Sequence, residues 1–259
     1  MRLDVYLTQM GYTDSRERAK RLISAGAVSL DGRVVDKPAF DVIGDPEVAV
    51  IEEEFVGRGG EKLKAALAYF SLDVQSARAL DIGASTGGFT QCLLKNGASS
   101  VVALDAGCGQ LHPSLRNDER VTNIEKYNAR DLRECDVGRF DLVVMDVSFI
   151  SATYILPHFP EVMLPNARAV TLIKPQFEVG RAALNKKGLV KSQKDHIFAV
   201  SRVLSAAKAA GLVPIGLAPS PIKGGDGNME YLACFALTGE SPITDASVTR
   251  VVMEGRICK

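Results

Sequence analysis

The chain has 259 residues, 46% of them hydrophobic, which suffices for one large domain or for a large domain with a small partner. Lysine plus arginine and aspartate plus glutamate number 31 each, so the net charge of zero gives no global signature of nucleic-acid binding. Five cysteines without C-x-x-C spacing and three scattered histidines argue against a metal site. Without an apolar run of about 18 residues or a signal peptide, we expect a cytoplasmic protein that does not enter membranes.

Residues 1–54 predict a small α+β domain. "RLDVYLTQMG" is typical of a helix that ends at Gly11, and "DSRERAKRLISAG" of a capped helix that ends at Gly26. "AVSLDGRVV" predicts a hairpin that turns at Asp31-Gly32, and "EVAVIEE" predicts a third strand.

The second of these helices carries its cations on one arc, opposite Ala19, Leu22 and Ile23. A solvated helix face and a phosphate-binding face both fit this pattern. The spacing R-L-D-x-x-L, then S-R-x-x-A-x-x-L-I-x-x-G-x-V-x-x-x-G-x-V, resembles the S4-type RNA-binding domain. The resemblance implies RNA contacts from Arg2, Arg16, Arg18, Lys20 and Arg21, although residues 1–54 hold seven Lys/Arg against eleven Asp/Glu.

The rest of the chain predicts a linker at 55–61, a second domain at 62–240 and a tail at 241–259 that is either a final strand or a mobile arm. The second domain alternates helical patterns with seven β runs: "RALDIG", "SVVALD", "RVTNIE", "FDLVVMD", "ARAVTLIK", "LVPIGLA" and "EYLACFAL". Only a loop joins the last two runs, so the seventh strand should be antiparallel to the sixth. Six parallel strands and one antiparallel strand make this α/β fold a Rossmann-like methyltransferase sheet.

A glycine-rich turn follows the first of these strands, in "ALDIGASTGGFT". Ser85 replaces the second glycine of the dinucleotide motif, and no Gly-Lys-Ser/Thr follows, which disfavours both a dinucleotide and a P-loop site. The turn resembles the first motif of S-adenosylmethionine-dependent methyltransferases. The resemblance implies S-adenosylmethionine as cofactor, held by residues of this turn and of the next two strand ends: Asp81, Gly83, Ser85, Gly87, Gly88, Asp105, Asn128 and Asp131.

Two lysines and two acids occupy further positions that can converge on the carboxyl edge of the sheet: Lys62, Asp146, Lys174 and Glu230. A lysine at the end of an apolar β run is unusual, although Lys174 could also be an ordinary surface residue. If Lys62 and Lys174 are neighbours, repulsion between them favours one as a base, and the acids can hold both by hydrogen bonds.

This set, within "RGGEKL", "DIGASTGGFT", "VMDVSFIS", "LIKPQFEVG" and "SPIKGGDGNMEYL", resembles the FtsJ-type ribose 2′-O-methyltransferases, specifically the TlyA family. The resemblance implies methyl transfer to a ribose 2′-hydroxyl of ribosomal RNA, by family a cytidine. It also implies ribosomal RNA or ribosomal subunits as partners and the four residues as the catalytic set. The sequence does not define the oligomeric state, and we favour a monomer.

Residues 179–194 are rich in glycine and cations and predict a flap that binds RNA through Arg181, Lys186 and Lys187, or else an ordinary exposed loop. Three other functions stay open. Because the family carries the name hemolysin, one is membrane perturbation. The others are an RNA-binding protein without catalytic activity and a small-molecule methyltransferase.

Overall fold

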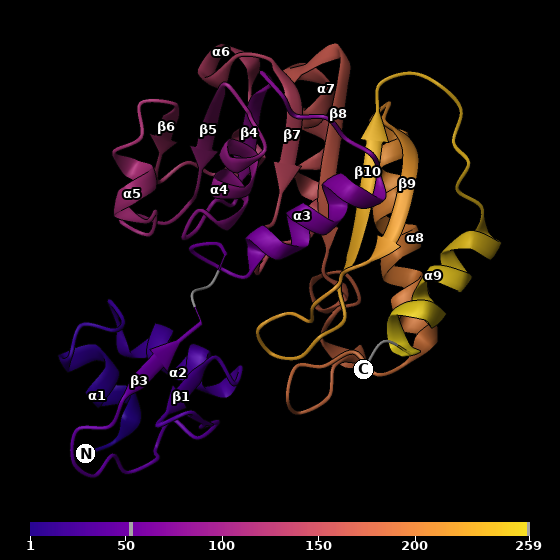
Figure 1. Ribbon diagram of the computed structural model, residues 1–259. Helices are drawn as coiled ribbons and strands as arrows, with labels where there is room; N and C mark the ends of the chain where they lie inside the picture. Colours follow the sequence, from indigo (N-terminus) through magenta and orange to yellow (C-terminus); the bar gives the residue numbers. More distant parts are fainter. Residues whose placement is uncertain (52–53, 258–259) are drawn as a thin grey trace. The chain divides into compact units, whose positions relative to one another are not determined.

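The computed structural model describes residues 1–51 and 54–257, and the chain divides into two compact units between Glu54 and Phe55 (Figure 1). Parts of two predicted segments lie outside the described residues: positions 52–53 of the first domain and 258–259 of the tail.

The N-terminal unit packs two helices against a three-stranded antiparallel sheet of order β2-β1-β3. Its turn residues Asp31 and Gly32 both have positive φ, +48° and +75°, as expected of a tight hairpin. Ser15 caps the second helix by accepting a hydrogen bond from the backbone N–H of Arg18. The elements are α1 (Leu3–Gln9), α2 (Arg16–Ser24), β1 (Val28–Leu30), β2 (Arg33–Val34) and β3 (Val48–Val50).

The second unit is built on a seven-stranded sheet of order β6-β5-β4-β7-β8-β10-β9. Strand β10 is antiparallel to both of its neighbours, and the other six strands are parallel to one another, which confirms the predicted methyltransferase sheet. The strands are β4 (Arg78–Ile82), β5 (Ser100–Leu104), β6 (Val121–Ile124), β7 (Phe140–Met145), β8 (Met163–Ile173), β9 (Val213–Pro219) and β10 (Tyr231–Ala236).

Helices cover both faces of this sheet, with α3 in front of it and α8 behind it in Figure 1. The α-helices are α3 (Gly59–Tyr69), α4 (Gly88–Lys95), α5 (Pro113–Arg116), α6 (Glu134–Val137), α7 (Phe159–Val162), α8 (Gln193–Ala209) and α9 (Asp245–Ile257). In the described residues, 3₁₀ helices lie in the connections from β6, β7 and β8 to the following α-helices: η1 (Ala129–Asp131), η2 (Ala152–Tyr154), η3 (Leu156–His158), η4 (Pro175–Phe177) and η5 (Arg181–Ala183).

Alternation along β4 decides which side chains each face receives. Leu80 and Ile82 belong to the core that includes α8 and α9. Ala79 belongs to the opposite core, which includes α3 and α4. Asp81 shares the parity of Ala79, so its side chain lies under α4.

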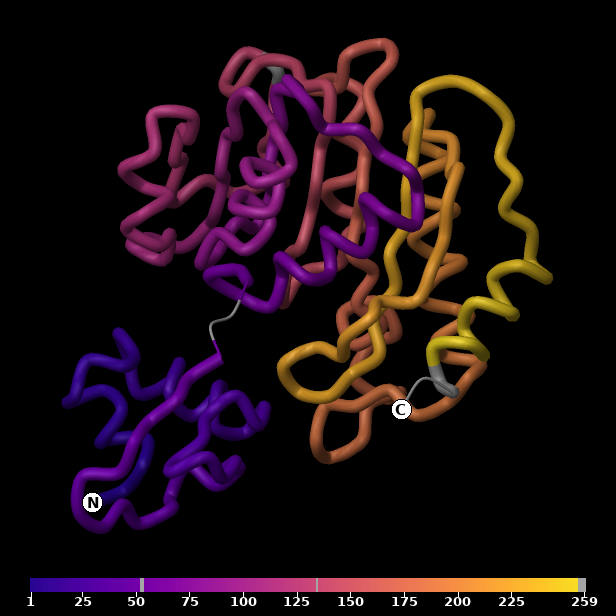
Figure 2. The backbone as a smooth tube through the Cα atoms, viewed as in Figure 1, coloured from indigo at the N-terminus to yellow at the C-terminus, as the bar shows by residue number. Residues whose placement is uncertain are grey.

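Two expectations about the ends of the second unit are corrected. The segment 55–61 is not a free linker, because Phe55 is only 4% exposed within the α3/α4 core and α3 begins at Gly59. The tail is neither a strand nor a mobile arm over its described residues. After a long loop that leaves β10, it returns as α9 and buries Val248, Val251 and Val252 against the sheet (Figure 2).

Candidate active site

The two predicted lysines and two predicted acids meet at the carboxyl edge of the sheet as a chain of alternating charges. Lys62 Nζ lies 2.6 Å from Glu230 Oε2 and 3.9 Å from Asp146 Oδ2. The other oxygen of Asp146 lies 2.6 Å from Lys174 Nζ, which also donates to Ser148 Oγ at 2.8 Å. The structure therefore brings all four predicted residues together, with a carboxylate between the two ammonium groups.

The side chains at the Asp146–Lys174 end of this chain of charges are more exposed than those at the Glu230–Lys62 end. The side chains of Glu230 and Lys62 are 2% and 7% exposed, those of Lys174 and Asp146 11% and 16%. Lys62 comes from α3, Asp146 and Lys174 follow β7 and β8, and Glu230 precedes β10. The Lys174 end is thus the one that a reactant can reach.

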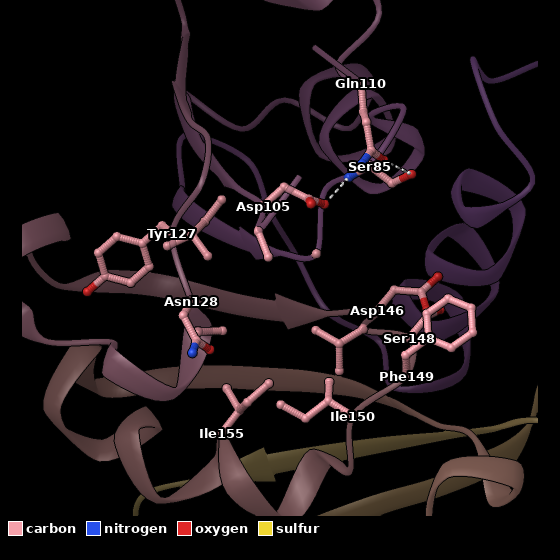
Figure 3. Close-up of a pocket in the computed structure, with 15 residues that line it drawn as sticks. Ser85, Asp105, Gln110, Tyr127, Asn128, Asp146, Ser148, Phe149, Ile150 and Ile155 are labelled. Carbon is pink, nitrogen blue, oxygen red and sulfur yellow. Dashed lines mark hydrogen bonds between the residues drawn. The ribbon is translucent and has the colours of Figure 1, made fainter. Parts of the chain in front are cut away.

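A cavity of about 450 Å³ opens beside Asp146 (Figure 3). Among the predicted cofactor residues, Gly83, Ser85, Asp105 and Asn128 line it. Apolar walls come from Ile150 and Ile155, among others.

Asp105 lies in the polar wall of this cavity, where two hydrogen bonds fix its carboxylate. Its Oδ2 accepts the backbone N–H of Ser85 at 2.8 Å, and its Oδ1 accepts that of Gly107 at 2.7 Å. Ser85 Oγ donates to Gln110 Oε1 at 3.2 Å. These contacts join the turn after β4 to the turn after β5 and fix a carboxylate at the cavity wall.

Asp146 also lines a second cavity, of about 170 Å³. Gly57, Arg58 and Gly59 at the start of α3, Gly88 at the start of α4, and Lys174 contribute to its wall. Gly83, Ser85, Asp146 and Ser148 line both cavities, so the chain of charges stands where the two spaces adjoin.

Three predicted cofactor residues line neither cavity: Asp81, Gly87 and Asp131. Asp81 is completely buried under α4, where its Oδ2 accepts a hydrogen bond from Thr90 Oγ1 at 2.7 Å. Burial raises the pKa of this carboxyl to about 7. Asp81 therefore lies beneath the turn, where its side chain contacts Thr90 and does not line either cavity.

The glycines of the turn serve packing at least as much as ligand approach. A Cβ on Gly83, whose φ is +84°, would stand 2.7 Å from the carbonyl oxygen of Asp146. At Gly88 it would stand 2.9 Å from that of Gly57, so this glycine lets α3 and α4 approach closely.

The sequence prediction missed several cavity residues, chiefly Tyr127, Ser148 and Phe149. The Tyr127 hydroxyl donates to Asp136 Oδ2 at 2.6 Å; burial and this partner raise its pKa to about 12. Phe149 has a φ of +64° and is 92% exposed, both unusual for a phenylalanine. Its place within "DVSFIS" gave no sign of this backbone conformation.

Glu178 holds the loop that carries Ser148 and Phe149. Its carboxylate is 2% exposed and accepts hydrogen bonds from Ser151 Oγ at 2.5 Å and from the backbone N–H of Ala152 at 2.8 Å. Burial raises the pKa of this carboxyl. Because Glu178 follows Lys174 by one helical turn, one short segment supplies a catalytic candidate and the anchor of the facing loop.

The predicted RNA-binding cations of the N-terminal unit are mostly paired. Arg2 Nε and Arg16 Nη2 each lie 2.9 Å from a carboxylate oxygen of the buried Asp4. Arg18 lies 3.4 Å from Asp14 and Lys20 lies 2.8 Å from Glu17. These four side chains stay 34% to 53% exposed, and Arg21 also has a partner. In the second unit Arg181, Lys186 and Lys187 are exposed.

The residues present fit S-adenosylmethionine. The larger cavity offers a fixed carboxylate for ribose hydroxyls, Asn128, and apolar walls for a purine. The smaller cavity extends from it between the first turns of α3 and α4, beside the chain of charges. Asp81, at the end of β4 just before the glycine-rich turn, has a buried oxygen, Oδ1, without a hydrogen-bond partner among the described residues.

A family model described as FtsJ-like methyltransferase matches residues 55–237, and an S4 domain model matches residues 1–43. A Mycobacterium tuberculosis protein named 16S/23S rRNA (cytidine-2'-O)-methyltransferase TlyA is 40% identical over 98% of both chains. This chain belongs to the TlyA family of FtsJ-like methyltransferases. The family confirms the predicted enzyme class and its methyl donor, S-adenosylmethionine.

Other TlyA-family relatives carry a different name. Hemolysin A of Brachyspira hyodysenteriae is 41% identical over 92% of this chain and its own full length. A solved structure of a hemolysin-named protein from Streptococcus thermophilus is 37% identical, covers 100% of this chain and 96% of its own, and superposes with a TM-score of 0.80. In residues 1–51 and 54–257, no helix combines the length and apolar character needed to span a membrane.

Proposed function

We propose that this TlyA-family protein methylates the ribose 2′-hydroxyl of a cytidine in ribosomal RNA, in the cytoplasm, with S-adenosylmethionine as donor. The observation that carries the proposal is the chain of charges Glu230–Lys62–Asp146–Lys174, which ends at a cavity wall where a hydroxyl can enter. Relatives named as ribosomal RNA (cytidine-2'-O)-methyltransferases support the substrate.

The cofactor would lie along both cavities, with Asp105 at its ribose and Asn128 near its adenine. Bound there, it supplies an electrophilic methyl group. Ser85 and Gly83, which line both cavities, would lie beneath its centre. We retain Gly87, Gly88 and Asp81 as residues that shape the turn rather than as contacts of equal standing.

Lys174 would orient the incoming 2′-hydroxyl and, in its neutral form, take the hydroxyl proton at Nζ. Asp146 would hold Lys174 in this position through the 2.6 Å contact. Lys62, fixed by Glu230, would stabilise negative charge that develops on the oxygen. Each lysine would thus act from a position that a carboxylate defines.

Phe149 would stack on the target base. An aromatic ring that is 92% exposed beside a nucleoside-sized cavity offers a face to a nucleobase, and stacking is the common way in which proteins hold unpaired bases. Its ring also contacts that of Phe177, with centroids 5.4 Å apart, which steadies it.

RNA outside the target nucleotide would be held by cations of both units. Arg2, Arg16, Arg18, Lys20 and Arg21 are the candidates in the S4 domain, and Arg181, Lys186 and Lys187 those in the methyltransferase unit. Contacts with phosphate fix register and orientation without reading sequence.

The test is transfer of a labelled methyl group to ribosomal subunits and to naked ribosomal RNA, with ribose methylation mapped on the product. We expect Lys174→Ala to lower kcat at least 100-fold, because general acid–base catalysis typically contributes that much. Lys208→Ala, an exposed lysine of α8, is the matched control and should keep the wild-type rate. A wild-type rate in Lys174→Ala would remove Lys174 from the mechanism.

Membrane perturbation is the second candidate, favoured only by the relatives named hemolysin. Leakage of clean lipid vesicles by nucleic-acid-free protein, equal in wild type and Lys174→Ala, would support it. We expect no leakage.

A further inference from the structure

Residues 184–190 form an ordered turn that we call the basic hairpin. Leu184 and Val190 pair as an antiparallel bridge. Inside it, Asn185 Oδ1 accepts the backbone N–H groups of Lys187 at 2.8 Å and of Leu189 at 2.9 Å. The turn therefore exposes Lys186 and Lys187 at its tip without depending on a ligand for its shape.

Asn228 attaches the basic hairpin to the loop before β10, and Figure 2 shows the two loops side by side. Its side chain is buried, with the residue only 3% exposed. Oδ1 accepts the N–H of Val190 at 3.0 Å, and Nδ2 donates to the carbonyl of Gly188 at 3.0 Å. One amide thus satisfies two backbone groups of the basic hairpin.

His196 holds the other backbone group of Val190. Its Nε2 lies 3.0 Å from the Val190 carbonyl oxygen, which can only accept, so Nε2 carries a proton. In the neutral ring, Nδ1 then accepts from the Tyr231 hydroxyl at 3.0 Å. His196 and Tyr231 are 2% and 0% exposed, so α8, β10 and the basic hairpin meet in one buried network.

Glu230 lies in the chain between Asn228, which bonds the basic hairpin, and Tyr231, which bonds His196. Its Oε2 holds Lys62 at 2.6 Å, and its backbone carbonyl accepts the N–H of Ser220 at 2.9 Å. The four residues 228–231 therefore connect the backbone of the basic hairpin to Glu230, the buried partner of Lys62.

We propose that Asn228 and His196 are positioning residues for the RNA substrate. They act through the basic hairpin, whose two lysines they hold at a set place relative to Glu230 and Lys62, so that a phosphate bound at the tip aligns the target ribose with Lys174. The proposal rests on the proposed function for its substrate. In this proposal the segment is a hairpin preorganised by the protein, and not the flap or exposed loop expected from the sequence.

The test measures kcat and KM for ribosomal RNA together with calorimetric binding of S-adenosylhomocysteine. Asn228→Ala removes two buried hydrogen bonds; we expect a roughly tenfold rise in KM for RNA and unchanged S-adenosylhomocysteine affinity. Asn117→Ala, an exposed asparagine after α5, is the control and should leave both unchanged. Amide exchange at Val190 should accelerate in Asn228→Ala.

A double-substitution cycle distinguishes a role in positioning RNA from a purely structural role. Lys187→Ala should raise KM and lower the salt dependence of RNA binding in wild type, yet add almost nothing to Asn228→Ala, because the hairpin is then already displaced. Additive effects would overturn the proposal, as would faster exchange with an unchanged KM.

His196→Phe keeps a ring but removes both hydrogen bonds, and it should raise KM in the same direction. If Asn228→Ala fails to fold, His196→Phe and its double-substitution cycle with Lys187→Ala test the proposal in its place. An unchanged KM for RNA in His196→Phe would then overturn the proposal. Absence of RNA methylation by the wild-type protein would instead defeat the proposed function, which separates the two failures.

Discussion

Each of the two units buries one aspartate completely, but the pKa of the carboxyl group is lowered in one unit and raised in the other. In the N-terminal unit, Asp4 accepts hydrogen bonds from Arg2 and Arg16, and these bonds, that from Arg2 foremost, lower its pKa to about 2. In the methyltransferase unit, Asp81 receives a hydrogen bond from the Thr90 hydroxyl, and burial raises its pKa to about 7. Burial alone does not set the charge of a carboxylate; cationic partners decide it.

The same contrast separates the uses of cations in the two units. Arg2 and Arg16 hold a carboxylate inside a small core and still expose half of each side chain. In the methyltransferase unit the relation is inverted, since Glu230 and Asp146 hold lysines at a cavity. Arg2 and Arg16 therefore act on stability through Asp4, whereas Lys62 and Lys174 lie together at the carboxyl edge of the sheet.

The largest expected effect on stability comes from breaking the chain of charges at Glu230. Glu230→Ala leaves Lys62 buried without its 2.6 Å partner, and loss of one member of a buried pair costs about 3–5 kcal/mol of unfolding free energy. Denaturant unfolding measures this change, and methyl transfer should fall with it. Glu254→Ala removes an exposed partner 3.9 Å from Arg250 and is the control, with an expected loss below about 0.5 kcal/mol. Equal losses in the two variants would contradict the buried pair.

Much of this arrangement follows from sequence, because strand ends can be located by pattern. Seven apolar runs predicted the seven strands, and the parallel order then brought Asp146 and Lys174 to one edge. What the strand pattern could not supply was the hydrogen bond that Asp81 accepts from Thr90, because that partner comes from α4, the next element of the chain.

Other misses had different physical causes. The positive φ of Phe149 depends on tertiary contacts of its loop, to which Glu178 contributes from a distant segment, and local propensity opposes it. The helix α9 could have been found, since Val248, Val251 and Val252 follow a helical spacing. Residues 179–194 were predicted as a flap or an exposed loop because their glycines and cations are visible in the sequence, whereas the contact of Val190 with Asn228 is not.

The second prediction tests the pKa contrast through the pH dependence of stability. Since Asp81 keeps its proton to about pH 7 when folded but loses it near pH 4 when unfolded, cofactor-free protein should lose stability as pH rises between these values, by up to about 4 kcal/mol. Asp81→Asn should remove this decline. Denaturant unfolding from pH 4 to pH 8 measures it, and a parallel decline in the variant would refute the raised pKa.

Asp4 should show the opposite slope. Its folded pKa of about 2 lies below its ordinary value of 3.8, so its contribution is complete above about pH 4 and lost as pH falls toward 2. Asp4→Asn should cost about 1–3 kcal/mol near neutral pH, because two charge-assisted hydrogen bonds are weakened, and it should flatten the acid slope. Amide exchange in α1 and α2, followed from pH 5 to pH 3 in the full chain, separates this unit from the other.

The smallest effect concerns two cations of one helix. Arg16 bonds the buried Asp4, whereas Lys20 pairs with Glu17 on the surface, where both side chains are well exposed. Lys20→Ala should therefore change the unfolding free energy by less than about 0.5 kcal/mol, and Arg16→Ala by about 1–2 kcal/mol.

If both side chains bind RNA phosphate, each substitution removes about one phosphate contact. Each should then make the slope of log binding constant against log salt concentration shallower by about one. Equal stability losses would show that net charge, rather than the bond to Asp4, stabilises this unit. An unchanged slope in either variant would remove that residue from the RNA surface.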